Sequence, residues 1–129
     1  MIRSAIIVAL GGAFGSAARY LVSRLIQTHA ASAFPVGTCA VNIAGCLLIG
    51  FIGALAGRAA GIGDGMKLFL TVGFCGGFTT FSTFCNESLG LMRGGNTLLA
   101  TVYMAVSLLL GLLAVQGGMA LANIIRPSL

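Results

Sequence analysis

The sequence contains very little charge and almost no carboxylates. Only 7% of its 129 residues are charged, and Asp64 and Glu87 are the two acidic side chains. Soluble domains carry about 25% charged residues. Because 58% of the residues are hydrophobic and the mean hydropathy is +1.08, there are too few polar groups to cover a water-facing surface. The composition predicts an integral membrane protein.

The residues that carry out enzyme chemistry are also scarce. The chain has one histidine, His29, and no carboxylate pair, phosphate-binding loop or metal-ligand cluster. Acid–base, nucleophilic and cofactor chemistry all lack the groups they need. The 4 cysteines have no CxxC spacing and fall in apolar runs, so we expect small buried side chains. The basic residues form no stripe, and we expect neither an enzyme nor a nucleic-acid partner.

The apolar residues form runs that are each long enough to cross a bilayer, which takes about 20 residues. The predicted spans cover about residues 4–26, 36–56, 66–92 and 97–124, separated by turn-like segments. We therefore expect one all-α, four-span domain over residues 1–129, with the N-terminal run retained as the first span. The expected location is the inner (plasma) membrane of a bacterium, in contact with lipid.

Glycines recur at a spacing of four residues along these spans. Such pairs let helix backbones approach closely, so we expect helix packing at these positions. The pairs are Gly11 with Gly15, Gly53 with Gly57, Gly73 with Gly77, and Gly90 with Gly94.

Basic residues are divided almost equally between the two sides of the membrane. The side of both termini carries Arg3, Arg58, Lys67 and Arg126, and the other side carries Arg24 and Arg93, with Arg19 just inside. The positive-inside rule needs a larger excess to fix one orientation. We infer insertion in both directions (dual topology), so that two opposed copies form a symmetric antiparallel homodimer. A single orientation set by the small bias is the alternative.

The third span is interrupted by glycines and hydroxyl side chains. The chain has no charge between Lys67 and Glu87, yet Gly73–Phe84 contains Gly73, Gly76, Gly77, Thr79, Thr80, Ser82 and Thr83. Irregular backbone at membrane depth persists only where protein buries it or where it lines a watery path. We predict a helix that is broken mid-membrane beside a pore or ion site.

Polar side chains within a membrane are functional candidates because their burial is costly. Outside the third-span hydroxyls they include Arg19, Asn42, Glu87, Tyr103 and Ser107. Most can donate hydrogen bonds to an anion. Phe81 and Phe84 are three residues apart, and aromatic ring edges carry positive partial charge. An anion path is one interpretation; ordinary ring packing and hydroxyls bonded to the preceding turn are the other.

Three segments together resemble one family of membrane proteins. Gly11–Tyr20 resembles a GGxxGxxxRY/W first span, and Gly37–Asn42, with Gly45 and Gly50, resembles a GTxxxN…G second span. Gly73–Phe84 followed by Glu87 resembles the hallmark third span of the Fluc (CrcB) fluoride channels. The resemblance runs the length of the chain.

The resemblance implies a passive, fluoride-selective channel that lets fluoride leave the cytoplasm. It implies an antiparallel homodimer with two pores and a structural, non-transported sodium ion (Na+) bound by backbone carbonyls of Gly76 and Thr79. The pore positions that it implies are Asn42, Phe81, Thr83, Phe84, Tyr103 and Ser107, to which we add the hydroxyls of Thr80 and Ser82. Arg19 and Glu87 match the family's first-span arginine and third-span acid, with electrostatic or structural roles.

Two positions depart from the family's pattern. Cys85 stands where members often have serine, and a thiol is a weaker donor. Gly111 stands where some members have another serine, which shortens the fourth-span hydroxyl track. Two other classes stay open: a small dual-topology, proton-coupled cation or drug exporter, and a non-transporting assembly subunit. The exporter needs a mid-membrane carboxylate, whereas Glu87 lies toward the end of its predicted span.

Overall fold

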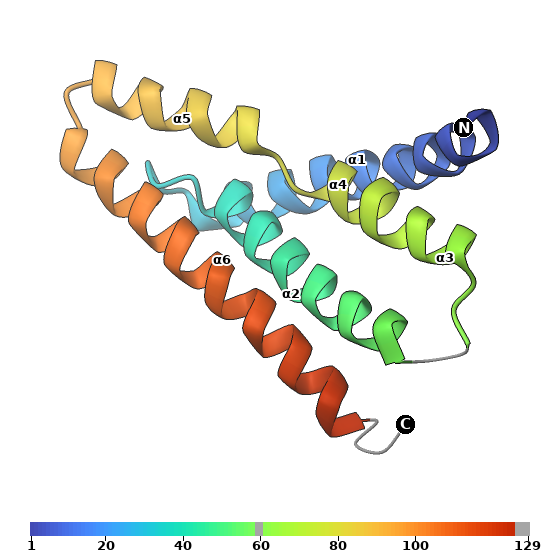
Figure 1. Cartoon of the computed structure of the whole chain (residues 1–129). Helices are drawn as coiled ribbons and strands as arrows, with labels where there is room; N and C mark the ends of the chain where they lie inside the picture. Colours follow the sequence, from blue (N-terminus) through green and yellow to red (C-terminus); the bar gives the residue numbers. More distant parts are fainter. Residues whose placement is uncertain (59–60, 126–129) are drawn as a thin grey trace.

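The structure is a computed structural model that describes residues 1–58 and 61–125, and this part of the chain is helical with no strand. Figure 1 shows the helices side by side. The elements are α1 (Ile2–Ala30), α2 (Val36–Arg58), α3 (Asp64–Leu68), the π-helix η1 (Phe69–Cys75), α4 (Gly76–Phe78), α5 (Phe81–Arg93) and α6 (Thr97–Ile125). Arg126, which entered the charge comparison, lies outside the described residues, as does the side chain of Arg58.

Within the described residues, 4 helical segments are long and apolar enough to cross a membrane. They are Ile2–Ala30, Val36–Gly57, Asp64–Arg93 and Thr97–Ile125. The predicted all-α, four-span organisation is therefore confirmed. The start of α1, the end of α2, the start of α3 and the end of α6 lie toward one end of the bundle, and the α1–α2 and α5–α6 connections lie toward the opposite end (Figure 1).

The helix ends follow local sequence signals. Ala31 closes α1 in the left-handed region with φ 44°, and its N–H donates to the carbonyl of Gln27. Pro35 comes directly before α2, where a residue without an N–H loses no helical bond. Its carbonyl accepts from the N–H of Cys39 at 3.0 Å. Gly95, with φ 81°, forms the α5–α6 turn in a conformation that favours glycine.

Close backbone approaches fix the helix pairs. A Cβ at Gly15 would collide with the carbonyl of Phe74, and one at Gly77 would lie 2.6 Å from the carbonyl oxygen of Gly12. Gly50 and Gly118 bring α2 and α6 together in the same way. Gly11 with Gly15 and Gly73 with Gly77 therefore pack as expected. The remaining two pairs, Gly53 with Gly57 and Gly90 with Gly94, meet no other helix within 4 Å among the described residues of the single chain.

Candidate functional site

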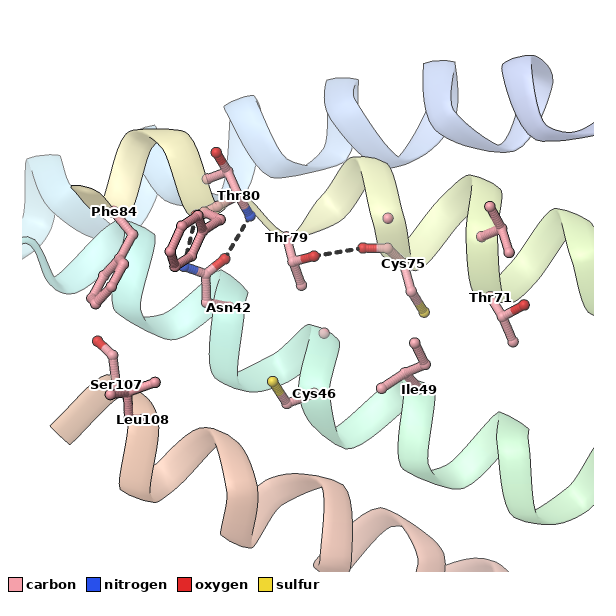
Figure 2. Close-up of a pocket in the computed structure, with 14 residues that line it drawn as sticks. Asn42, Cys46, Ile49, Thr71, Cys75, Thr79, Thr80, Phe84, Ser107 and Leu108 are labelled. Atoms are coloured by element: carbon pink, nitrogen blue, oxygen red, sulfur yellow. Dashed lines mark hydrogen bonds between the residues drawn. The ribbon is translucent and has the colours of Figure 1, made fainter. Parts of the chain in front are cut away.

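The third span breaks at Thr79 and Thr80, which have extended backbone between α4 and α5. Asn42 on α2 bonds both backbone groups of Thr80 (Figure 2). The Thr80 N–H donates to Asn42 Oδ1 at 2.7 Å, and Asn42 Nδ2 donates to the Thr80 carbonyl at 3.2 Å. One side chain thus replaces the helical bonds that the break removes, and the predicted mid-membrane interruption is present.

The hydroxyls around the break bond mostly to their own segment. Thr80 caps α5: its Oγ1 accepts from the Thr83 N–H at 3.3 Å and donates to Thr83 Oγ1 at 3.0 Å. Thr79 Oγ1 donates back to the Cys75 carbonyl at 3.0 Å. Ser82 Oγ lies 3.5 Å from Thr80 Oγ1. Several of these hydroxyls therefore stabilise the break itself.

The bonds at the break take away the usual helical N–H donors of two backbone carbonyls. The Thr80 N–H, which would reach the Gly76 carbonyl in a continuous helix, goes to Asn42. The Thr83 N–H, which would reach the Thr79 carbonyl, goes to the Thr80 hydroxyl. Gly76 is exposed. These two oxygens form a donor set of the kind that hard cations prefer.

Arg19 contacts the same segment from α1. Its Nε donates to the carbonyl of Gly77 at 3.1 Å, which satisfies another carbonyl at the end of α4. The bond joins the first span to the broken one. Sequence patterns identified Arg19 as important but gave no partner for it.

Glu87 lies within the helical bundle and receives two hydroxyl donors. Thr38 Oγ1 donates to Oε1 at 2.7 Å, and the Tyr103 hydroxyl donates to Oε2 at 2.9 Å. Thr38 and Tyr103 are buried. Sequence reasoning did not single out Thr38, although it belongs to the second-span motif. Both oxygens of the carboxylate are therefore engaged.

A cavity of about 710 Å³ lies beside the break, and we call it the central cavity (Figure 2). Its walls include the predicted site residues Asn42, Gly76, Thr79, Thr80, Phe81, Phe84 and Ser107. They also include Cys46, Thr71 and Cys75, which the sequence did not indicate as site residues. Ser82, Thr83, Tyr103, Arg19 and Glu87 are not among the residues that line it. The predicted site residues therefore fall into two groups: those that line the central cavity and those that lie outside its walls.

A second cavity, of about 270 Å³, lies near the α1–α2 connection, and we call it the outer cavity. Its walls include Arg24, Thr38 and Glu87. Phe84 lines the central cavity and packs on Tyr103 with ring centroids 5.1 Å apart, and Tyr103 in turn bonds Glu87. The buried cluster of Cys39, Phe84 and Tyr103 therefore connects the wall of the central cavity, through Phe84, to Glu87 in the wall of the outer cavity.

Phe81 and Phe84 differ in environment although their ring centroids are 6.0 Å apart. Phe84 is 9% exposed, whereas Phe81 is 76% exposed. The four cysteines also differ: Cys39 and Cys75 are buried and Cys46 is half-buried, but Cys85 is exposed. The expectation of burial is wrong for Cys85, because an apolar neighbourhood in sequence does not determine which side of the helix faces the core.

The fold and the site define a small multi-pass membrane protein with a largely apolar cavity at an interrupted span, into which a few polar groups are set. A family model described as "CrcB-like protein, Camphor Resistance (CrcB)" matches residues 6–119, and the chain belongs to this family. The family membership predicted from the three sequence motifs is confirmed.

Curated bacterial relatives cover nearly the whole chain, and each is named "Fluoride-specific ion channel FluC". One from Bacteroides fragilis is 49% identical over 88% of this chain and 91% of its own length. One from Chlorobaculum tepidum is 45% identical over 96% and 98%. One from Flavobacterium psychrophilum is 40% identical over 90% and 94%. With the apolar helices, these relatives identify a multi-pass protein of the bacterial inner membrane.

Proposed function

We propose that this protein is a passive, fluoride-selective channel through which fluoride leaves the cytoplasm down its electrochemical gradient. The relatives named as fluoride channels support this function. The main structural observation in its favour is the central cavity at the helix break. Its walls include the amide of Asn42, the hydroxyl of Ser107 and the ring of Phe84. The protein is a channel rather than an enzyme.

Energetics require that the dry part of an anion path be short. Moving a small anion into a medium of low dielectric costs on the order of 20 kcal/mol. Each hydrogen bond to a charged group recovers about 1.5–3 kcal/mol. A few donors therefore suffice only over a brief stretch. Here the buried cluster of Cys39, Phe84 and Tyr103 connects the walls of the two cavities, and the dry part of the path would lie at this cluster.

The path runs from the central cavity, past Phe84 and Tyr103, to Thr38 and the outer cavity. Ser107 and Asn42 supply donors on one side of the buried cluster. The hydroxyls of Tyr103 and Thr38 are the donors on the other side of the cluster. Both donate to Glu87 when no anion is bound, and an anion that reaches them would replace Glu87 as the acceptor. Several weak anion sites, placed one after another along the path, favour conduction of the ion over its trapping at one site.

The functional unit is an antiparallel homodimer whose partner covers the face that carries Gly76 and Phe81. Glycine within a helix costs roughly 0.5–1 kcal/mol relative to alanine. A Cβ at Gly76 would meet nothing within 4 Å among the residues that the structure describes, so their packing does not account for this glycine. A backbone of a second copy accounts for it, and for the 76% exposure of Phe81. The near balance of charge between the two sides supports opposed orientations.

A structural sodium ion fits the centre of such a dimer. The carbonyls of Gly76 and Thr79 would hold it, and two-fold symmetry doubles two oxygens into four. A bound cation would supply fixed positive charge and join the two broken helices. It is not transported in this proposal.

Fluoride flux from liposomes tests the function. Purified protein is reconstituted into vesicles loaded with fluoride or chloride, and efflux is followed with ion-selective electrodes. Fluoride efflux without chloride efflux is the expected result, and equal passage of both would overturn the selectivity. Uptake of an organic cation against a proton gradient would instead support the exporter. That class is not favoured, because both oxygens of Glu87 are engaged.

A further inference from the structure

The hydroxyl of Ser107 is directed away from its own helix. Thr71, Ser88 and Thr101 each donate to the carbonyl four residues earlier, as serine and threonine in helices often do. Ser107 donates instead to the sulfur of Cys39 on α2, with 3.7 Å between Oγ and Sγ. Figure 2 shows its oxygen directed toward Phe84. The Ser107 hydroxyl is therefore held by a neighbouring helix.

Cys39 provides a fixed acceptor at the edge of the central cavity. Its side chain is 6% exposed and belongs to the buried cluster with Phe84 and Tyr103. Ser107 is half-buried and lines the central cavity, whereas Cys39 does not. The sulfur can therefore act on an anion only through the serine.

Sulfur accepts hydrogen bonds weakly. A carbonyl or hydroxyl acceptor would hold the Ser107 hydrogen more firmly, and without any acceptor on α2 the hydroxyl would turn back to the carbonyl of Tyr103. An anion forms a hydrogen bond roughly twice as strong as one between neutral groups. The Cys39 thiol is thus suited to orient the Ser107 hydroxyl, because the weak bond to sulfur breaks readily when an anion accepts the hydrogen instead.

We propose that Cys39 is a positioning residue of the conduction path. Its sulfur keeps the Ser107 hydroxyl from turning back to its own helix, so that the hydroxyl stays beside the central cavity in a bond that fluoride displaces at little cost. This inference rests on the proposed fluoride conduction and adds a residue that touches no ion itself.

A double-mutant cycle on fluoride efflux tests the inference. Cys39→Val keeps a small apolar side chain, larger than cysteine by about one methyl group, and has no acceptor; Ser107→Ala removes the donor. We expect Cys39→Val to lower efflux by about fivefold or more, the equivalent of one net hydrogen bond. In the Ser107→Ala background the same change should alter efflux by less than about twofold. Cys39→Ser, which restores an acceptor, should recover part of the lost flux.

The control is Thr101→Val, which removes a hydroxyl that bonds only its own helix. It should leave efflux unchanged and the effect of Cys39→Val undiminished. An equal loss with and without Ser107, no loss in either background, or a Cys39→Ser variant as slow as Cys39→Val would overturn the positioning role. A wild-type protein that passes no fluoride overturns the proposed function, and this inference with it. Size-exclusion elution of each variant shows whether the assembly is intact.

Discussion

Asn42 and Thr80 form a reciprocal pair of hydrogen bonds, 2.7 Å from the Thr80 N–H to Oδ1 and 3.2 Å from Nδ2 to the Thr80 carbonyl. The two residues are 38 positions apart in the chain. The pairing gives the interrupted backbone the partners that a continuous helix would have supplied, and it places an amide in the wall of the central cavity. One side chain therefore both stabilises the break and contributes to the wall of the cavity.

Asn42→Asp should impair both roles. An ionised carboxylate has no hydrogen for the Thr80 carbonyl, and it puts negative charge beside the anion path. Leaving that carbonyl unpaired costs about 1–3 kcal/mol. We expect fluoride efflux to fall by at least about tenfold, which corresponds to roughly 1.4 kcal/mol in the barrier. Asn96→Asp, in the exposed α5–α6 turn, is the matched control; wild-type flux through Asn42→Asp would contradict the assignment.

Phe81→Ile should slow fluoride without unfolding the protein. Phe81 is 76% exposed in one subunit, so its ring stabilises the single chain little. Its loss removes the aromatic edge at the central cavity. We expect efflux to drop while the dimer elutes normally in detergent. Phe14→Ile changes another exposed ring, on α1, and should leave efflux as it is. Equal flux in the two variants would show that the Phe81 ring only packs against its neighbours and does not act on the anion.

Gly76→Leu should weaken the dimer but not the fold of the subunit. A Cβ at this position meets nothing within 4 Å among the described residues, so we expect the larger side chain to clash mainly with a second copy. It would also crowd the carbonyls proposed for sodium. Dimer dissociation on dilution, measured with sodium or with N-methylglucamine, should become easier and insensitive to sodium.

The glycine control for this experiment is Gly90→Leu on α5, which also meets nothing within 4 Å. It should dimerise like the wild type and keep its response to sodium. A Gly76→Leu dimer that is as stable and as sodium-dependent as the wild type argues against the cation site.

Thr38→Val should destabilise the buried Glu87 network. The change keeps the shape of the side chain but leaves Glu87 Oε1 without the donor at 2.7 Å. We expect a loss of about 1–3 kcal/mol of stability, measured by thermal unfolding in detergent, together with slower fluoride efflux. Thr101→Val removes an exposed hydroxyl of the same kind and should unfold like the wild type. A Thr38→Val protein that matches it would show that the bond is dispensable.

The spans and the break follow from local properties of the sequence. Apolar runs of sufficient length must cross the membrane as helices, because only a helix satisfies its own backbone there. Glycines and hydroxyls in Gly73–Phe84 marked the interruption for the same reason. Asn42 and Ser107 could be proposed as cavity residues because an amide and a hydroxyl are costly in lipid unless they have a function.

The partners of these groups could not be read from the chain. Whether a hydroxyl caps a helix, as Thr80 does, or crosses to another helix, as Ser107 does, depends on which helices lie side by side. The link from Thr38 to Glu87 spans 49 positions and the link from Arg19 to Gly77 spans 58. No local sequence pattern predicts a contact between residues so far apart in the chain.

The sequence by itself determined a four-span membrane protein with a broken third helix and a supply of donors, because hydropathy and backbone satisfaction act over a few turns. Only the tertiary structure decided which donors line the central cavity, which carbonyls at the break lose their partners, and that Cys39 receives the hydrogen of Ser107. Those outcomes depend on how α2, α5 and α6 pack, and packing is a property of surfaces that meet only in the folded chain.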